Sequence, residues 1–331
     1  MSLVKKASLQ STEIAIETDG ETAELGFARA MLAGLRQEPK SVPCRFLYDR
    51  RGSELFEEIT RLPEYYPTRT ETAILQDCAE DIRQKTPAGS LLVEFGSGSS
   101  TKTEILLDKL DRLAGYVAVD ISPAALDDAS ERLSRRFPDL PIYAVVGNFS
   151  SPMTLPDEFS SKPKLGFFPG STIGNLERDE AVRLLSNMRA ILGPGSQLIV
   201  GADLKKDAKV LVQAYDDSQG VTAEFNLNLL TRANRELRAD FDVASFEHLA
   251  RYDEAEGRME SYLVSKTDQR VQVLGHTFEF AAGEKVHTEN SHKYDISEFA
   301  ELCRAANWEP LEVYTDSAEL FSVHLMKNSA D

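Results

Sequence analysis

Short apolar runs alternate with amphipathic stretches along the middle of the chain. Apolar residues recur at helical spacing in three stretches, which predicts helices at Thr103–Leu113, Pro123–Phe137 and Asp179–Leu192. Alternation of strands and helices predicts a doubly wound α/β sheet that binds its ligand at the carboxyl ends of the strands. The five predicted strands are Ser90–Phe95, Tyr116–Asp120, Ile142–Val146, Lys164–Phe168 and Gln197–Asp203.

The regular alternation stops near Leu204. The following residues, up to about Lys293, contain helix-like stretches and then alternating runs that predict an antiparallel meander. This segment is too long for a loop, so we expect an inserted subdomain. The alternating runs are Arg258–Val264, Gln269–Phe280 and Glu284–Ser291.

The last part of the chain returns to the first pattern. A helix at Asp295–Ala306 precedes two apolar runs, Glu309–Tyr314 and Phe321–Met326, which a polar turn joins. A closing antiparallel hairpin after five parallel strands is typical of the Rossmann-like class I methyltransferase sheet, and it is unusual for dehydrogenases.

Glycines directly follow the first strand. Gly96 and Gly98 let the backbone turn sharply and let a ligand approach closely. Asp120 ends the second strand, where an acid can accept hydrogen bonds from both ribose hydroxyls. The dinucleotide fingerprint needs a third glycine, and this chain has Thr101 there. The pattern therefore favours S-adenosylmethionine over a nicotinamide cofactor.

These patterns divide the chain into two parts. We expect an S-adenosylmethionine-binding domain at residues 66–204 and 293–331. The second part is an α+β subdomain formed by the N-terminal segment and the insert, residues 1–65 and 205–292, which we expect to bind the substrate.

The acidic composition restricts the partners. The 331 residues carry a formal net charge of −17, which repels phosphate backbones and anionic membranes, so we expect binding to neither. The three cysteines are far apart, no apolar signal core follows Met1, and no stretch approaches membrane-spanning length. We expect a cytoplasmic monomer that acts on a small molecule.

Four polar segments resist an explanation by packing. Together they resemble the family of histidine Nα-methyltransferases of ergothioneine biosynthesis, which form hercynine (N,N,N-trimethylhistidine). The resemblance runs from about Phe46 to Met326. The segments are Leu-Pro-Glu-Tyr-Tyr-Pro-Thr-Arg at 62–69, Phe-Pro-Gly-Ser-Thr-Ile-Gly-Asn-Leu at 168–176, Gln-Ala-Tyr-Asp-Asp at 213–217 and Thr-Glu-Asn-Ser-His-Lys at 288–293.

The resemblance implies a site for an amino acid. Asn175 and Tyr215 match positions that hold the substrate α-carboxylate, for which an amide and a phenol are suitable neutral partners. Tyr48 and Tyr65 match tyrosines at the amine and cofactor end, where we expect them to orient the amine or pass its proton to water.

Two further residues match the pair that reads the imidazole ring. Glu289 and Ser291 are spaced i, i+2, which puts both side chains on one face of a strand. The carboxylate can accept from one ring N–H, and the hydroxyl can serve the other nitrogen. Relatives that act on other amines would not need this pair, so it is the expected determinant of specificity.

The resemblance also implies the cofactor contacts. Family members carry an aspartate where this chain has Asn148, which can still meet the adenine amine with altered polarity. The stretch Met259–Ser261 does not align, so the apolar wall of the site stays unassigned. The implied cofactor-binding residues are Tyr65, Gly96, Ser97, Gly98, Lys102, Asp120, Asn148 and Phe149.

Each candidate also has a structural alternative. Tyr48 and Tyr65 could be interface tyrosines with a bonded hydroxyl, and Glu289 could be a solvated strand residue. Asn148 could be an ordinary turn residue, and Asn175 a helix cap.

A metal site is a further alternative. His287 and His292 lie close to Glu289 in sequence. The chain has no His-Glu-x-x-His helix or cysteine set that would support such a site, so we expect no metal.

The expected reaction is methyl transfer from S-adenosylmethionine to the α-amine of L-histidine, up to three times. The alternatives are a related N-methyltransferase for another amino acid or aromatic amine, a non-catalytic S-adenosylmethionine-binding protein, and a nicotinamide oxidoreductase.

Overall fold

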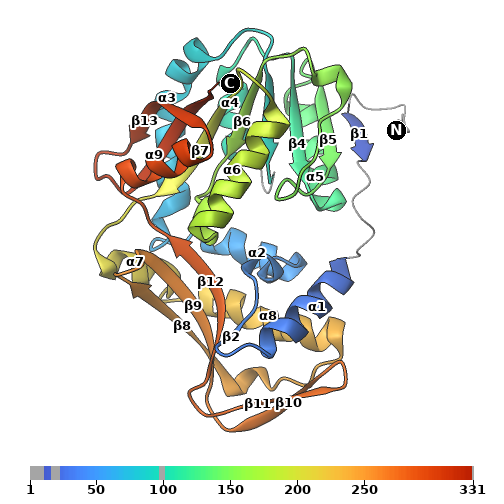
Figure 1. Ribbon diagram of the computed structural model, residues 1–331, viewed down its shortest axis with the longest axis vertical. Helices are drawn as coiled ribbons and strands as arrows, with labels where there is room; N and C mark the ends of the chain where they lie inside the picture. Colours follow the sequence, from blue (N-terminus) through green and yellow to red (C-terminus); the bar gives the residue numbers. More distant parts are fainter. Residues whose placement is uncertain (1–10, 16–22, 97–100, 330–331) are drawn as a thin grey trace. The chain divides into compact units, whose positions relative to one another are not determined.

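The chain folds into two compact units (Figure 1). A computed structural model describes residues 11–15, 23–96 and 101–329. Unit 1 comprises residues 1–19, 70–204 and 294–331, and unit 2 comprises residues 20–69 and 205–293.

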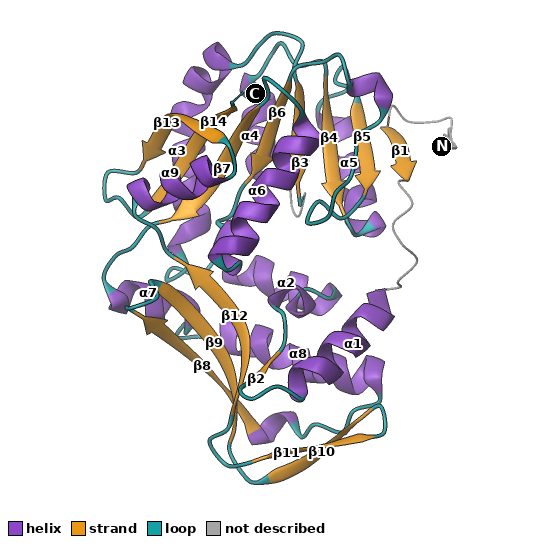
Figure 2. Ribbon diagram, viewed as in Figure 1, coloured by secondary structure: helices purple, strands orange, loops and turns teal. Residues whose placement is uncertain are grey.

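Unit 1 is built on an eight-stranded sheet with the order β1-β5-β4-β3-β6-β7-β14-β13 (Figure 2). Neighbours from β1 to β7 pair in parallel, whereas β14 pairs antiparallel with both β7 and β13. The expected Rossmann-like sheet with a terminal antiparallel hairpin is confirmed. The strands are β1 (Ser11–Ala15), β3 (Leu91–Phe95), β4 (Gly115–Asp120), β5 (Ile142–Val146), β6 (Lys164–Phe168), β7 (Gln197–Asp203), β13 (Trp308–Thr315) and β14 (Phe321–Asn328).

Helices cover both faces of this sheet because its central strands are apolar on both sides. In β3, Val93 belongs to the core under α6 and α9, and Leu92 belongs to the core under α3, α4 and α5. The helices are α3 (Tyr66–Lys85), α4 (Thr101–Lys109), α5 (Pro123–Arg136), α6 (Arg178–Leu192) and α9 (Ile296–Ala305), with short 3₁₀ turns η2 (Asp157–Phe159) and η3 (Thr172–Asn175).

One segment lies in a different unit from the one we expected. We expected residues 1–65 in the substrate-binding subdomain, but residues 11–15 form β1, which pairs in register with β5 at the edge of the sheet of unit 1. The run Ser-Thr-Glu-Ile-Ala is too short and too polar for its sequence to predict a strand. Backbone hydrogen bonds to β5, rather than an apolar pattern of its own, define β1.

Unit 2 holds a four-stranded sheet with the order β2-β12-β9-β8 and a separate hairpin, β10–β11. Helix α8 packs against α2 and against β8 and β9. The strands are β2 (Lys40–Ser41), β8 (Phe246–Asp253), β9 (Arg258–Ser265), β10 (Gln269–Val273), β11 (His276–Phe280) and β12 (Lys285–His292). The helices are α1 (Ala23–Leu35), α2 (Arg50–Ile59), α7 (Ala208–Tyr215) and α8 (Val221–Leu237), with 3₁₀ turns η1 (Cys44–Leu47) and η4 (Val243–Ser245).

The meander of unit 2 differs from its sequence pattern in one detail. The single predicted run Gln269–Phe280 is two strands, because Leu274 and Gly275 both have positive φ, 51° and 79°, and form a tight turn between them. Strand β8 escaped prediction, since only Phe246 and Ala250 among its eight residues are buried.

No helix among residues 23–96 and 101–329 is long and apolar enough to cross a membrane.

Replacement of Leu185 by alanine should destabilise unit 1. Leu185 lies fully buried on α6, and its carbonyl oxygen accepts a 2.9 Å hydrogen bond from Nε1 of Trp308, the single tryptophan of the chain. The cavity should cost about 2–5 kcal/mol of unfolding free energy. Urea denaturation followed by tryptophan fluorescence measures this loss.

Leu311→Ala on β13 is the control, because 41% of Leu311 is exposed. It should cost less than about 1 kcal/mol. Equal losses for the two variants would contradict the placement of Leu185 in the core.

Candidate functional site

The candidate residues fall into two sets. Unit 1 contains Gly96, Lys102, Asp120, Asn148, Phe149 and Asn175, and unit 2 contains Tyr48, Tyr65, Tyr215, Glu289 and Ser291. Ser97 and Gly98 lie outside the described residues.

The sheet order of unit 1 brings the ends of β3, β4 and β5 side by side. Gly96 follows β3 with φ +78°, a conformation that favours glycine, and its N–H donates to the Val119 carbonyl oxygen at 2.9 Å. At the end of β4, Oδ1 of Asp120 accepts from the Ser122 N–H at 2.9 Å. The glycine turn and the acid therefore lie on neighbouring strands at one edge of the sheet.

Phe149 follows β5 at the same edge. Its ring centroid lies 5.6 Å from that of Phe95 and 6.0 Å from that of Phe168, so apolar neighbours hold the ring. A Cβ atom placed on Gly96 would lie 3.8 Å from Cζ of Phe149, which is an ordinary contact distance. The Gly96 turn is therefore not crowded by this ring.

Asn148 forms a turn. Its Oδ1 accepts from the Ser150 N–H at 3.0 Å, and its carbonyl oxygen accepts from the Ser151 N–H at 3.0 Å. The structural alternative considered for Asn148 is thus present, and contact with adenine stays a proposal.

A buried carboxyl group lies behind the glycine turn. Glu94 on β3 accepts hydrogen bonds from Oγ1 of Thr103 at 2.7 Å and from the Tyr116 hydroxyl. Burial raises the pKa of Glu94 to about 7, although these hydrogen bonds oppose the shift. Through its hydrogen bond with Thr103, the Glu94 carboxyl group connects the end of β3 to the first turn of α4.

Lys102 forms an ion pair with Glu71 of α3, a residue that the sequence reasoning missed. Only 1% of Glu71 is exposed, and its two oxygens also accept from the Gly170 N–H at 3.0 and 2.9 Å. A side chain at Gly201 would collide with the same carboxylate. The sequence signal that could have indicated Glu71 is its position between Thr70 and Ile74, where an acidic residue lies on the buried face of a helix.

Asn175 ends η3 and is half-buried. The residue that caps α6 is Glu177, whose N–H donates to Oε2 of Glu180 in a capping box. The alternative role of Asn175 as the helix cap is therefore wrong, because the helix begins beyond its reach.

Aromatic side chains from several elements of unit 2 surround the two candidate tyrosines. The Tyr48 ring contacts Phe56 and Phe225 edge-on, with centroid distances of 5.4 and 5.3 Å. The Tyr65 ring lies 6.1 Å from Phe56 and 6.3 Å from Tyr215, again edge-on. Such contacts restrict where each hydroxyl can point.

The Tyr48 phenol stays protonated at neutral pH. Although 38% of the residue is exposed, burial of its hydroxyl raises its pKa well above the usual value, and the charge of Glu289 raises it further. Tyr48 is therefore suited to donate a hydrogen bond and is a poor base.

A register shift in β12 decides which side chains share a face of the four-stranded sheet. It lies between His287 and Glu289. Residues paired directly across an antiparallel ladder share a face. Asn290 pairs with Glu260, whereas Glu289 and Ser291 pair with Ser261 and Met259.

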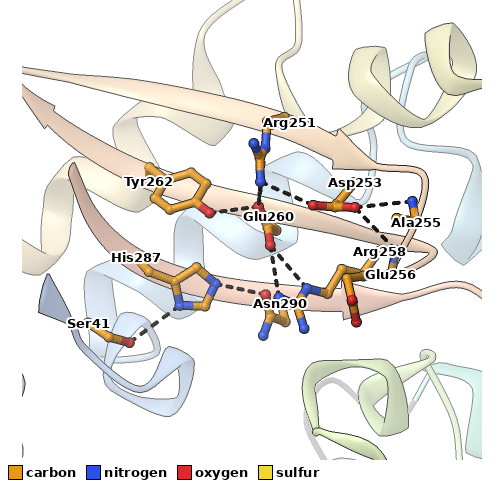
Figure 3. Close-up of polar contacts among 10 residues, drawn as sticks. All are labelled: Ser41, Arg251, Asp253, Ala255, Glu256, Arg258, Glu260, Tyr262, His287 and Asn290. Atoms are coloured by element: carbon orange, nitrogen blue, oxygen red, sulfur yellow. Dashed lines mark hydrogen bonds and ion pairs between the residues drawn. The ribbon is translucent and has the colours of Figure 1, made fainter. Parts of the chain in front are cut away.

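Figure 3 shows one of these faces, which we call the network face. Glu260 accepts from Tyr262 at 2.6 Å and forms ion pairs with Arg251 and Arg258 at 2.6 and 3.0 Å. Burial alone would raise the pKa of Glu260, but these partners lower it to about 2. The other members of the network face are Ser41, Asp253, His287 and Asn290.

The opposite face carries Glu289, Ser291 and Lys293. The Tyr215 hydroxyl donates to Oγ of Ser291 at 2.7 Å, and Nζ of Lys293 donates to both oxygens, at 2.9 and 2.8 Å respectively. Ser291 and Lys293 are buried. Sequence reasoning missed Lys293, although Lys293 ends the polar segment 288–293 that contains Glu289 and Ser291.

Burial raises the pKa of Glu289 to about 7, while the charge of Lys293 opposes the shift. Glu289 is half-buried rather than fully solvated, and its part in binding stays a proposal. Its carboxyl group changes charge close to neutral pH.

The metal alternative gains no support. His287 lies on the network face, where its Nε2 is 2.8 Å from Oδ1 of Asn290, so it points away from Glu289. Within the described ranges, no three His, Cys, Asp or Glu side chains are placed to hold a metal ion.

The two sets suit different ligands. In unit 1, a glycine turn, an acid and an aromatic ring at adjacent strand ends fit a nucleoside. In unit 2, a carboxyl group and a hydroxyl on one strand face fit a polar ring that has both a donor and an acceptor.

Comparison with known proteins agrees with this geometry. Residues 27–328 match the family model described as histidine-specific methyltransferase, SAM-dependent. A histidine N-alpha-methyltransferase of Mycobacterium tuberculosis is 42% identical, over 92% of this chain and 96% of that one. Ergothioneine biosynthesis protein 1 of Neurospora crassa is 32% identical, over 88% of this chain and 33% of that one.

A solved structure shares the fold. Mitomycin 7-O-methyltransferase superimposes with a TM-score of 0.50 at 13% identity, over 93% of this chain and 69% of that one. This structure and the family model confirm the expected methyltransferase architecture, and the family model confirms S-adenosylmethionine as the cofactor. The chain belongs to the family of histidine-specific, S-adenosylmethionine-dependent methyltransferases.

Proposed function

We propose that the chain transfers three methyl groups from S-adenosylmethionine to the α-amino nitrogen of L-histidine and forms hercynine, the first step of ergothioneine biosynthesis. The pairing of Glu289 and Ser291 on one face of β12, in a chain of this family, carries the proposal. The names of the mycobacterial and Neurospora relatives support the substrate and the pathway.

The residues of unit 1 fit the cofactor. Gly96 leaves room for the ribose and the methionine part of the cofactor, and Asp120 accepts from the ribose hydroxyls. Asn148 and Phe149 contact the adenine. Ser97, Gly98, Lys102 and Tyr65 complete the proposed cofactor contacts. When bound, S-adenosylmethionine supplies an electrophilic methyl group on a sulfonium.

Other residues hold histidine at its two ends. Asn175 and Tyr215 bind the α-carboxylate, while Glu289 and Ser291 bind the imidazole. With both ends held, the amine can grow from primary to quaternary while the anchors stay in place. One site can therefore perform all three transfers.

The attacking amine must be neutral. An α-amino group has a reference pKa of about 7.7–8.0 in peptides, and that of a free amino acid is higher, so the ammonium form predominates at neutral pH and binding must favour the neutral amine. The positive charge of the sulfonium does this, because like charges disfavour the ammonium. Tyr48, whose high pKa keeps it protonated, and Tyr65 orient the nitrogen, and the released proton passes to water. Positioning supplies most of the catalysis, with little covalent work for the protein.

We further propose that the chain works in the cytoplasm as a monomer, without nucleic acid or membrane partners. Its net charge of −17 disfavours association with polyanions.

The reaction can be tested directly. Incubation of the protein with S-adenosylmethionine and each amino acid in turn, read by mass spectrometry, should yield trimethylated product from histidine. No turnover of histidine would reject the proposal. Methylation of an aromatic amino acid instead would support the related N-methyltransferase, and cofactor binding without any turnover would support a non-catalytic binding protein.

Asp120→Ala should weaken S-adenosylmethionine binding about 10- to 100-fold, because hydrogen bonds to a charged group contribute roughly 1.5–3 kcal/mol. Calorimetric titration measures the affinity. Asp139→Ala, an exposed acid of the same unit, is the matched control and should leave the affinity unchanged.

Histidine binding should depend on the charge of Glu289. With a pKa of about 7, the carboxylate predominates above that pH and is lost below it. A protonated carboxyl accepts ring N–H groups poorly, so affinity should fall between about pH 8 and pH 6 by more than protonation of the histidine ring alone accounts for. Calorimetry across this range measures the change.

Glu289→Ala should lose at least about tenfold in histidine affinity at the upper pH and keep its cofactor affinity. Glu247→Ala, an exposed glutamate on β8, is the control and should behave like the unaltered protein. An unchanged histidine affinity in Glu289→Ala would remove Glu289 from the site.

A further inference from the structure

Lys293 is a buried cation to which neither the sequence pattern nor the proposed reaction gives a role. It follows β12, and only 2% of it is exposed. Its backbone N–H donates to the Gly257 carbonyl oxygen at 2.8 Å, which anchors the chain at this point. An ammonium group is costly to bury without partners, so its contacts deserve a functional explanation.

Two of the contacts of Lys293 are with the hydroxyls proposed to bind the substrate. Its Nζ lies 2.9 Å from the Tyr215 oxygen and 2.8 Å from Oγ of Ser291, and 4.7 Å from the centroid of the Tyr215 ring. All three residues belong to unit 2.

The chemistry of these groups sets the direction of their hydrogen bonds. An ammonium group can only donate, and a hydroxyl has one hydrogen and two acceptor lone pairs. Oγ of Ser291 accepts from both Lys293 and Tyr215, which occupies both of its lone pairs. What Ser291 has left for a ligand is its hydrogen.

When a substrate carboxylate takes the hydrogen of Tyr215, Oγ of Ser291 accepts from Lys293 and keeps its hydrogen and one lone pair for the ligand. The ammonium of Lys293 favours the arrangement in which Ser291 gives its hydrogen to the ligand, because an N–H donor of a charged ring would meet the positive charge of Lys293. Ser291 then donates to an unprotonated ring nitrogen, while Glu289 accepts from a ring N–H. A neutral imidazole has one nitrogen of each kind, whereas an imidazolium has two N–H donors.

The positive charge of Lys293 also favours a neutral ring. Lys293 is close enough to Glu289 for its positive charge to favour the carboxylate. A protonated ring between Ser291 and Glu289 would place a second positive charge near the ammonium of Lys293, and like charges in a buried site repel strongly.

We propose that Lys293 is a specificity-setting positioning residue, which makes Ser291 and Tyr215 hydrogen-bond donors and so restricts the site to the neutral imidazole ring in one tautomer. This inference rests on the proposed function, because it assumes that histidine is the ligand.

The test compares two ligands that differ in ring basicity. L-Histidine has a ring pKa of about 6.5, whereas the ring of 2-fluoro-L-histidine stays neutral throughout the range used. Calorimetry gives the dissociation constant of L-histidine divided by that of 2-fluoro-L-histidine, at about pH 8 and pH 5.5. Because both ligands meet the same protonation state of Glu289, the ratio isolates the charge of the ring.

In the unaltered protein the ratio should rise about tenfold at the lower pH, which is the factor by which the neutral fraction of histidine falls. In Lys293→Met the rise should shrink to less than about threefold. The control Lys285→Met alters an exposed lysine of β12 and should keep the full rise. A full rise in Lys293→Met, or no rise in the unaltered protein, would overturn the inference.

A second measurement needs no variant. The ¹⁵N spectrum of ring-labelled histidine bound to the unaltered protein should show one protonated and one unprotonated ring nitrogen at the lower pH. Two protonated nitrogens would overturn the inference and leave the proposed function intact, provided that histidine is bound and methylated. Absence of histidine binding at the higher pH would overturn both.

Discussion

One extra residue in β12 decides which side chains the sheet of unit 2 offers to a ligand. The register shift leaves Thr288 outside the ladder, and its Oγ1 donates to the Ser261 carbonyl oxygen at 3.0 Å. In a regular strand, His287 would share a face with Glu289 and Ser291, because side chains alternate. The shift instead sends His287 to the network face. The proposed reading of the substrate depends on this local departure from regular pairing.

Buried Glu260 and half-buried Glu289 lie on opposite faces of that sheet, and the pKa values of the two are shifted in opposite directions. Glu260 is surrounded by donors, and its low pKa keeps it charged as a structural group of the network face. No such shell of donors from the described residues surrounds Glu289, and its pKa is about 7, with the charge of Lys293 opposing the effect of burial. A carboxylate that is already saturated could not accept from a ligand, so the poor solvation of Glu289 is what suits it for binding.

Buried carboxyl groups also shape unit 1. Glu94 connects the end of β3 to α4, and Glu71 connects Lys102 of α4 to the backbone at Gly170. These contacts hold the strand ends in place before any ligand binds. Methyl transfer requires mainly that two reactants be held in line, so preorganised backbone contributes directly to the proposed catalysis.

The sequence alone determined the architecture of unit 1, while the candidates for the substrate site came from its resemblance to a known family. Its apolar runs have lengths and spacings that only a parallel sheet with covering helices can bury, and the i, i+2 spacing of Glu289 and Ser291 requires a shared face. Those are local rules, and they were sufficient for the central strands of the sheet and for the shared face of the pair.

Tertiary structure decided what local rules cannot reach. Strand β1 exists through its pairing with β5, and Glu177 rather than Asn175 caps α6. Glu71 and Lys293 matter through partners that lie 31 and 78 residues away in sequence, Lys102 and Tyr215 respectively. Burial and hydrogen-bond direction are set by such distant contacts, which is why the pKa of Glu289 and the role of Lys293 could be read only from the fold.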